Sequence, residues 1–347
     1  MGMDRTDAAA AAAATAGRGL DAAPANIVMP PRRRAAARGQ GQVDRLYHGA
    51  SLVVALGLVV TLGALVVMLL ATAWPAIGRL GPGFFVGTVW NSTSDVYGAL
   101  PFIAGTVITT ALALLIAVPV SLAIAILLTE YAPRPLAATL GVVIDVAAGV
   151  PTIVFGVWAL LALYPWMRDT AEPAVAAVLG WLPLFNRNDI SGEGMLTAGV
   201  VLAAMVFPTI VVVTRNAILA VPMEMREASL GLGATRWETA TRVALRQARP
   251  GLLGGVILAC GRALGEIMAI IYILGTVPRL PNSLFDVGNT IAAQLFTQAL
   301  GVIPGTLTIA ALYELGLILL ALSLLTSLGG RFLTRLSGTT SLAGGGR

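Results

Sequence analysis

Residues 215–250 read RNAILAVPMEMREASLGLGATRWETATRVALRQARP, and residues 251–276 continue as GLLGGVILACGRALGEIMAIIYILGT. The second run is apolar and exceeds the roughly 20 residues that a helix needs to cross a bilayer, yet it contains Arg262 and Glu266. Their four-residue spacing predicts that both charges lie on one face of a single helix. Inserting an ionised Arg at the bilayer centre costs about 2.5–3.5 kcal/mol, so something must offset that cost.

The composition places the chain in a membrane. Hydrophobic residues make up 57% of its 347 residues and charged residues 11%, whereas soluble domains carry about 25% charged residues. Every basic residue is Arg and most lie beside apolar runs, so the positive net charge indicates contact with membrane lipid and no nucleic-acid partner. A P-loop ATPase needs a Lys to reach the nucleotide phosphates, and this chain contains none. Another polypeptide must therefore hydrolyse any ATP that drives this protein.

Apolar segments predict an all-α integral membrane protein with six transmembrane helices. The segments are 50–74, 101–129, 138–164, 196–214, 251–276 and 303–328. Six crossings leave both termini on one side of the membrane. Seventeen Arg residues then fall on that side and four on the other, which predicts that both termini are cytoplasmic.

The same pattern divides the chain into three parts. Residues 1–45 are rich in Ala and Arg and are expected to form a disordered cytoplasmic tail. Residues 46–336 form the six-helix membrane domain, and residues 337–347 form a C-terminal cytoplasmic tail.

Residues 215–250 predict a helical hairpin outside the membrane. Pro222 suits the start of a first short helix, which a glycine-containing turn then ends. Thr235 and Glu238 form a T-x-x-E capping box for a second helix, which we expect to end at Pro250. The simplest interpretation of such a segment is a solvated amphipathic hairpin, so the charge pattern alone leaves its role open.

This hairpin contains a recognisable motif. Glu227-Ala228-Ser229, then three residues, Gly233, nine residues and Val243-Ala244-Leu245, resembles the EAA loop of ABC importer permeases, although Arg246 stands where that family usually has Pro. The resemblance implies that the loop docks on an ATPase subunit and carries its motion to the membrane helices. The coupling residues that it implies are Glu227, Ala228, Ser229, Gly233, Arg236 and Leu245.

Three further stretches narrow the resemblance to the phosphate-specific permease family. They are GRALGEIMAI (261–270), ALPFIAGTVITTALALLIAVPVSLAIAILLTEYAP (99–133) and IDVAAGVPTIVFGVW (144–158). The RALGE form and the later PRLPNSLFD (278–286) favour its PstC-type subunit.

This narrower resemblance implies a type I ABC importer permease fold in a bacterial inner membrane. It implies four further subunits of three kinds: a PstA-type second permease, two PstB-type ATPases that bind the ATP, and an extracytoplasmic PstS-type phosphate-binding protein. No cofactor is implied for this chain itself.

Arg262 is the first candidate for the substrate pathway, because a planar guanidinium fork suits the oxygens of phosphate. Glu266 would hold it in place and prevent binding too tight for release. The structural alternative is that these two residues form only a buried ion pair. Asp145, near the cytoplasmic end of its segment, and Glu314, which could pair with Arg262 across helices, are the other pathway candidates.

Three alternatives stay open at this point, one within transporters and two from other classes of function. The main alternative is a permease for another tetrahedral oxyanion, sulfate or molybdate. The second is a membrane-embedded enzyme, whose carboxylates would be Asp145, Glu266 and Glu314. Against an enzyme or a metal centre, the sequence has no His-Glu-x-x-His, no G-x-S-x-G and no cluster of His or Cys. A receptor-like membrane protein, finally, would not need the cytoplasmic hairpin.

Overall fold

The computed structural model describes residues 36–186, 189–299, 301 and 305–338. The chain divides into two compact units, Met1–Ala64 and Leu65–Arg347. The described part of the first unit is the beginning of helix α2 (Ala36–Leu80), whose remainder belongs to the second. Residues 1–35 of the expected tail lie outside the described residues, and residues 36–45 are helical.

Among its described residues, the second unit consists of helices, connecting loops and one small hairpin, in which β1 (Trp90–Asn91) pairs antiparallel with β2 (Val96–Tyr97). Its other elements are α3 (Gly83–Val86), α4 (Leu100–Ile126), α5 (Arg134–Ala148), α6 (Thr152–Trp158), α7 (Tyr164–Trp166), α8 (Glu172–Leu179), α9 (Met195–Leu219), α10 (Met223–Gly231), α11 (Arg236–Glu238), α12 (Leu245–Leu264), α13 (Met268–Leu274), α14 (Ile291–Ala299) and α15 (Leu307–Gly338). Short π-helical turns follow α4 (Leu127–Tyr131), join α6 to α7 and α7 to α8, and join α11 to α12 (Thr239–Ala244).

The expected number of membrane crossings agrees with the helices. Four are long and apolar enough to cross a bilayer: Leu46–Leu80, Leu100–Tyr131, Met195–Leu219 and Leu307–Arg335. Two bent pairs are the other candidates: Arg134–Ala148 with Thr152–Leu179, and Arg236–Leu264 with Met268–Leu274. If each bent pair is one crossing, the described residues contain six, as predicted.

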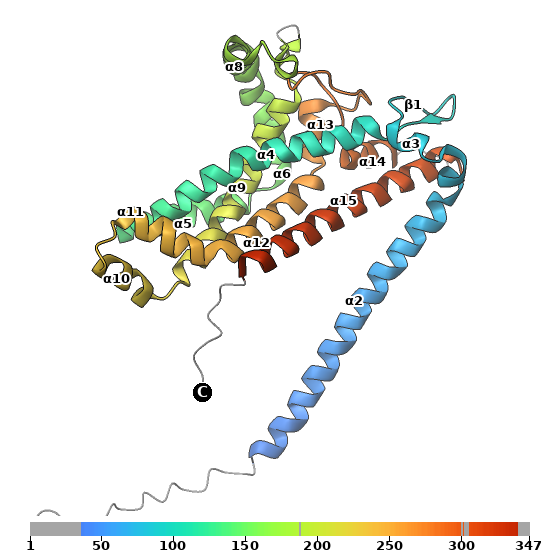
Figure 1. The fold of residues 1–347 in the computed structure, drawn as a ribbon. Helices are drawn as coiled ribbons and strands as arrows, with labels where there is room; N and C mark the ends of the chain where they lie inside the picture. The colour runs from blue at the N-terminus through green and yellow to red at the C-terminus, as the bar shows by residue number, and fades with distance from the viewer. Residues whose placement is uncertain (1–35, 187–188, 300, 302–304, 339–347) are drawn as a thin grey trace, which may run out of the picture. The chain divides into compact units, whose positions relative to one another are not determined.

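Helix α9 lies at the centre of the second unit, packed against α4, α5 and α12 (Figure 1). Glycines allow these helices to approach closely. A Cβ added at Gly199 of α9 would meet the Leu112 side chain of α4 at 2.6 Å, and one added at Gly255 of α12 would meet Val213 of α9 at 3.1 Å. Small residues at helix crossings are typical of membrane bundles, where backbones must come close to gain packing energy.

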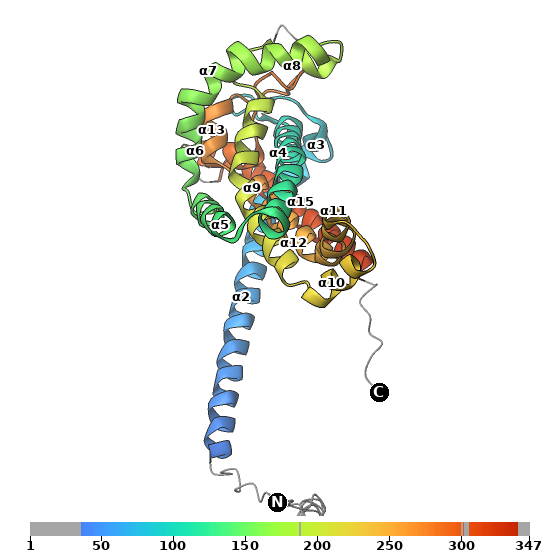
Figure 2. The same cartoon turned by 90° about the vertical axis from the view of Figure 1, so that its left-hand side faces the viewer.

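The third predicted crossing, 138–164, is not one straight helix. Helix α5 ends at Ala148, and α6 begins after Pro151 at an angle of 93°. Pro151 has no N–H to continue the preceding helix, but its fixed φ suits the start of the next one. The new helix then runs through α7 and α8 to Leu179, as Figure 2 shows, well beyond the predicted end of this crossing at residue 164.

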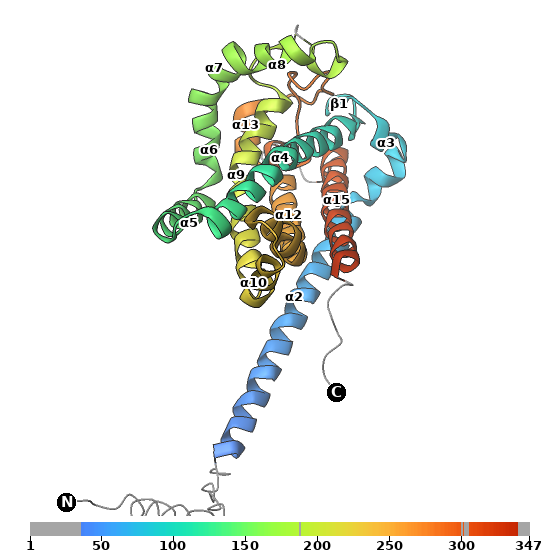
Figure 3. The same cartoon turned by 60° about the vertical axis from the view of Figure 1, so that its left-hand side comes forward.

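The fifth predicted crossing, 251–276, is also broken. Helix α12 ends at Leu264, and α13 begins at Met268 after a bend of 58°. The second halves of the two broken crossings pack against each other, and Figure 3 shows α6 beside α13. A Cβ at Gly156 would lie 2.9 Å from the Tyr272 ring and 3.1 Å from the Cα of Ala269, so this contact leaves no room for a side chain.

Candidate functional site

The predicted hairpin forms an elbow, which we define as residues 222–249. Its first arm, α10, ends at Gly231, and Gly233 turns the chain with φ +88°, a backbone conformation that suits glycine. The capping box is present, since Thr235 Oγ1 accepts from the backbone N–H of Glu238 at 3.2 Å and the Glu238 carboxylate accepts from that of Thr235 at 3.0 Å. The short-helix, glycine-turn and capped-helix prediction is therefore confirmed.

The second arm of the elbow does not stop where the sequence predicted. The helix that begins at Arg236 continues without a break to Leu264, with Pro250 inside it. A proline in a helix removes one hydrogen bond and bends the axis, and helices in membranes tolerate this when neighbours compensate. The predicted end at Pro250 is therefore wrong. The second arm of the elbow and Arg262 lie on one continuous helix, Arg236–Leu264, which we call the rod.

The outer surface of the elbow carries apolar side chains that nothing covers in this single chain. Leu232 is 90% exposed, Met223 61% and Trp237 59%. Of the residues that the EAA motif implies, Glu227, Ala228, Gly233 and Arg236 are exposed on the same elbow, whereas Ser229 and Leu245 are half-buried. Exposed apolar residues gathered on a charged surface are typical of protein interfaces.

The inner surface of the elbow packs on the membrane bundle. Ala240, Ala244 and Ala248 are buried and recur every fourth residue along the rod. They pack in one cluster with Ile126 at the end of α4 and Ile218 at the end of α9. Alanine is small enough for two helices to lie close together along such a face.

Arg262 lies in the last turn of α12 and is half-buried. Glu266 lies beyond the end of that helix, is 7% exposed, and accepts a hydrogen bond from the Ala269 backbone N–H at 3.2 Å. The expectation that the two charges share one helical face is wrong, because the helix ends at Leu264 before it reaches Glu266. Glu266 instead stabilises the start of α13, where free backbone N–H groups can donate hydrogen bonds to a carboxylate.

The four predicted pathway residues are not joined to one another. Among the residues that the structure describes, no hydrogen bond or ion pair involves the Arg262 guanidinium, so neither Glu266 nor Glu314 is its partner. Glu314 is 4% exposed on α15, and its Oε2 has no hydrogen-bond partner there. Asp145 is exposed on α5.

Two clusters of buried, hydrogen-bonded polar residues were not predicted from the sequence. Thr106 Oγ1 accepts from the Ile291 N–H at the start of α14 at 2.9 Å, and the Asn289 amide donates to Gln294 Oε1 at 3.0 Å. Asn289, Ile291 and Gln294 lie between the predicted crossings 251–276 and 303–328, a position in the sequence that does not predict their burial. The available signal was a run of hydroxyl residues within the apolar segment 101–129, which needs hydrogen-bond partners when buried.

The second cluster surrounds Glu172 of α8, whose side chain is fully buried. Its carboxylate accepts from the Gly192 N–H at 3.0 Å and from the Thr197 hydroxyl at 3.3 Å. These bonds tie the extension of the third crossing to the first turn of α9.

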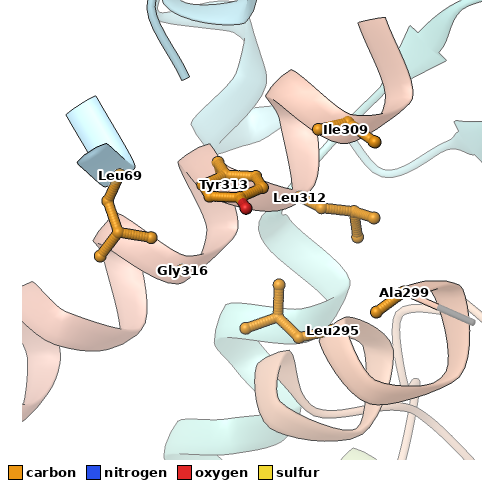
Figure 4. Close-up of a pocket in the computed structure, with 7 residues that line it drawn as sticks. All are labelled: Leu69, Leu295, Ala299, Ile309, Leu312, Tyr313 and Gly316. Carbon is orange, nitrogen blue, oxygen red and sulfur yellow. The ribbon is translucent and has the colours of Figure 1, made fainter. Parts of the chain in front are cut away.

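The apolar cavity in Figure 4 is separate from Arg262 and Glu266 and has a volume of about 340 Å³. It is lined by Leu69, Leu295, Ala299, Ile309, Leu312, Tyr313 and Gly316. Among the described residues, no three His, Cys, Asp or Glu side chains lie close enough together to hold a metal ion.

Known proteins share this sequence over most of its length. Residues 117–335 match the family described as binding-protein-dependent transport system inner membrane component. The phosphate transport system permease protein PstC of Mesorhizobium japonicum is 38% identical, over 84% of this chain and 90% of its own. That of Haemophilus influenzae is 39% identical over 82% and 90%, and PstC 1 of Mycobacterium tuberculosis is 36% identical over 87% and 97%.

Solved structures of ABC transporters are more distant. The inward-facing methionine transporter MetNI covers 69% of this chain and 94% of its own, with 20% identity and a TM-score of 0.45. The identities and coverage of the sequence relatives decide the assignment: the chain is a multi-pass membrane protein that belongs to the binding-protein-dependent transport system inner membrane component family, in its group of PstC phosphate transport system permeases.

Proposed function

We propose that this chain is a permease subunit of an ATP-driven importer of inorganic phosphate, and that it forms the translocation pathway together with a second, PstA-type permease. The observation that carries this proposal is the continuous rod from Arg236 to Leu264. One end of the rod is an exposed elbow suited to a partner, and its other end presents Arg262 at a break in the crossing.

The chain acts as a permease and not as an enzyme, with ATP hydrolysed by partner subunits. We infer two PstB-type ATPases, one of which docks on the elbow of this chain, and a PstS-type phosphate-binding protein on the outer side. The exposed Leu232, Met223 and Trp237 supply apolar contact area for docking. Glu227 and Arg236 lie on the same elbow and would add charged contacts that set specificity.

Phosphate would meet Arg262 as a transient ligand. The guanidinium has no partner among the described residues, and an arginine fork that is free can bind the oxygens of an anion. Glu266, held by the Ala269 N–H at 3.2 Å, would place a negative charge near the break without neutralising Arg262. Repulsion between the Glu266 carboxylate and the anion would shorten the time for which the anion stays bound, as transport requires.

Glu314 and Asp145 have weaker support as pathway residues. Burying a carboxylate oxygen without a hydrogen-bond partner, as in Glu314, costs free energy. A carboxylate that occurs in a membrane segment despite this cost is a candidate for a functional role. Asp145 is exposed on α5, and we place it at the cytoplasmic exit.

The Arg distribution supports a cytoplasmic position for both termini in a bacterial inner membrane. It also supports a cytoplasmic position for the elbow, where ATP is available.

The test is uptake of radiolabelled phosphate, sulfate and molybdate by a strain that lacks this chain. We expect phosphate uptake through this system to disappear and to return when the chain is supplied from a plasmid, while the other two anions are unaffected. A selective loss of sulfate or molybdate uptake would assign the permease to that anion and contradict the proposal.

A further inference from the structure

Arg226 of the elbow turns inward, although its neighbour Glu227 is exposed. Its Nη1 donates to Glu130 Oε1 at 2.7 Å, and the two side chains are only 12% and 14% exposed. Glu130 lies in the π-helical turn Leu127–Tyr131 at the end of α4. A charge pair at this depth is screened far less by water and salt than one on the surface.

The same guanidinium makes a second attachment. Its Nη2 donates to the backbone carbonyl of Ile218 at 2.6 Å, in the last turn of α9. Carbonyl groups at a helix C-terminus lack partners within the helix and carry partial negative charge, so they attract a cation. One side chain of α10 therefore holds the ends of both α4 and α9, the two helices at the centre of the bundle.

The elbow is internally braced. Its two arms are joined by the hydroxyls of Ser229 and Thr239, 3.0 Å apart, and the capping box fixes the turn between them. Within the described part of the chain, α10 packs mainly on the Thr239–Ala244 turn of the elbow itself. Arg226 is therefore the charged link between the first arm and the membrane bundle.

We propose that the Arg226–Glu130 pair is the joint through which movement of the elbow reaches α4 and α9, with both residues acting as positioning residues for transport. The inference rests on the proposed function, because it assumes that an ATPase moves the elbow. The rod transmits that movement to Arg262, and the pair makes the α4–α9 core move with it. Without the pair, the first arm could shift while the core stays in place.

The experiment uses the whole transporter, purified with its second permease, ATPase and binding protein and placed in lipid vesicles. The quantity measured is the number of phosphate ions moved per ATP hydrolysed. We expect Arg226→Gln and Glu130→Gln each to lower this ratio about tenfold, equivalent to about 1.4 kcal/mol. The double variant should be no worse than Arg226→Gln alone, because Glu130→Gln removes nothing further from the pair once the guanidinium is gone.

The matched control is Arg168→Gln. Arg168 pairs with Asp169 at 2.8 Å, away from the elbow, and these side chains are 50% and 59% exposed, so the ratio should stay at the wild-type value. If Arg226→Gln does not assemble, Arg226→Lys keeps the charge but loses the fork, and an intermediate ratio is expected.

The ratio separates coupling from stability, because a loss of assembled complex lowers uptake and hydrolysis together. A wild-type ratio in Arg226→Gln or in its Lys substitute, or losses that add in the double variant, would overturn the inference alone. A wild-type complex that hydrolyses ATP but moves no phosphate would instead overturn the proposed function.

Discussion

At the scale of single residues, Arg226 and Arg262 illustrate two uses of a guanidinium. Arg226 is held by Glu130 and a helix terminus, whereas Arg262 has no partner among the residues that the structure describes. Arg262→Gln should therefore leave assembly intact, because it strands no opposite charge, and should lower phosphate uptake about tenfold or more by removing a charged hydrogen-bond donor.

Uptake and co-purification of the ATPase, measured on the same membranes, check this prediction. Arg262→Lys is the graded control, since it keeps the charge without the planar fork and should retain part of the uptake. Loss of the ATPase from the purified complex would show instead that Arg262 is structural.

At the scale of elements, the two broken crossings depend on each other. Helices α6 and α13 meet at Gly156, where a Cβ would lie 2.9 Å from the Tyr272 ring. Gly156→Leu should therefore force the helices apart and destabilise the fold by about 1–3 kcal/mol, the usual effect of overpacking. A lower thermal midpoint of the purified chain in detergent would measure it.

Gly254 offers a matched control on α12, because an added Cβ there meets nothing within 4 Å. Gly254→Ala should leave the midpoint unchanged or raise it slightly, since alanine favours helix. An unchanged midpoint in Gly156→Leu would mean that α6 and α13 do not pack as described.

At the scale of the whole molecule, the orientation in the membrane can be tested with introduced cysteines. The only native cysteine, Cys260, is buried, so background labelling should be low. Ser94 in the β1–β2 hairpin and Gly231 in the elbow are both exposed, and the proposed orientation has them on opposite sides of the membrane.

We expect a membrane-impermeant maleimide to label Ser94→Cys in sealed spheroplasts and to label Gly231→Cys only after the cells are opened. Labelling of Gly231→Cys in sealed spheroplasts would reverse the proposed orientation. It would also remove the elbow from the compartment that contains ATP.

Much of this protein was predictable from the sequence. The membrane location, the six crossings and the capped elbow all followed from local patterns. These features are decided residue by residue, because the bilayer selects for apolar length and the backbone selects for caps and glycine turns.

Only the tertiary structure decided where the helices break and which charges meet. The bend before Glu266, the passage of the rod through Pro250 and the inward turn of Arg226 all depend on neighbours supplied by distant parts of the chain. A helix can bend, or contain a proline, when another helix packs against it and satisfies its polar groups. Sequence periodicity assumes a straight helix and contains no information about that neighbour.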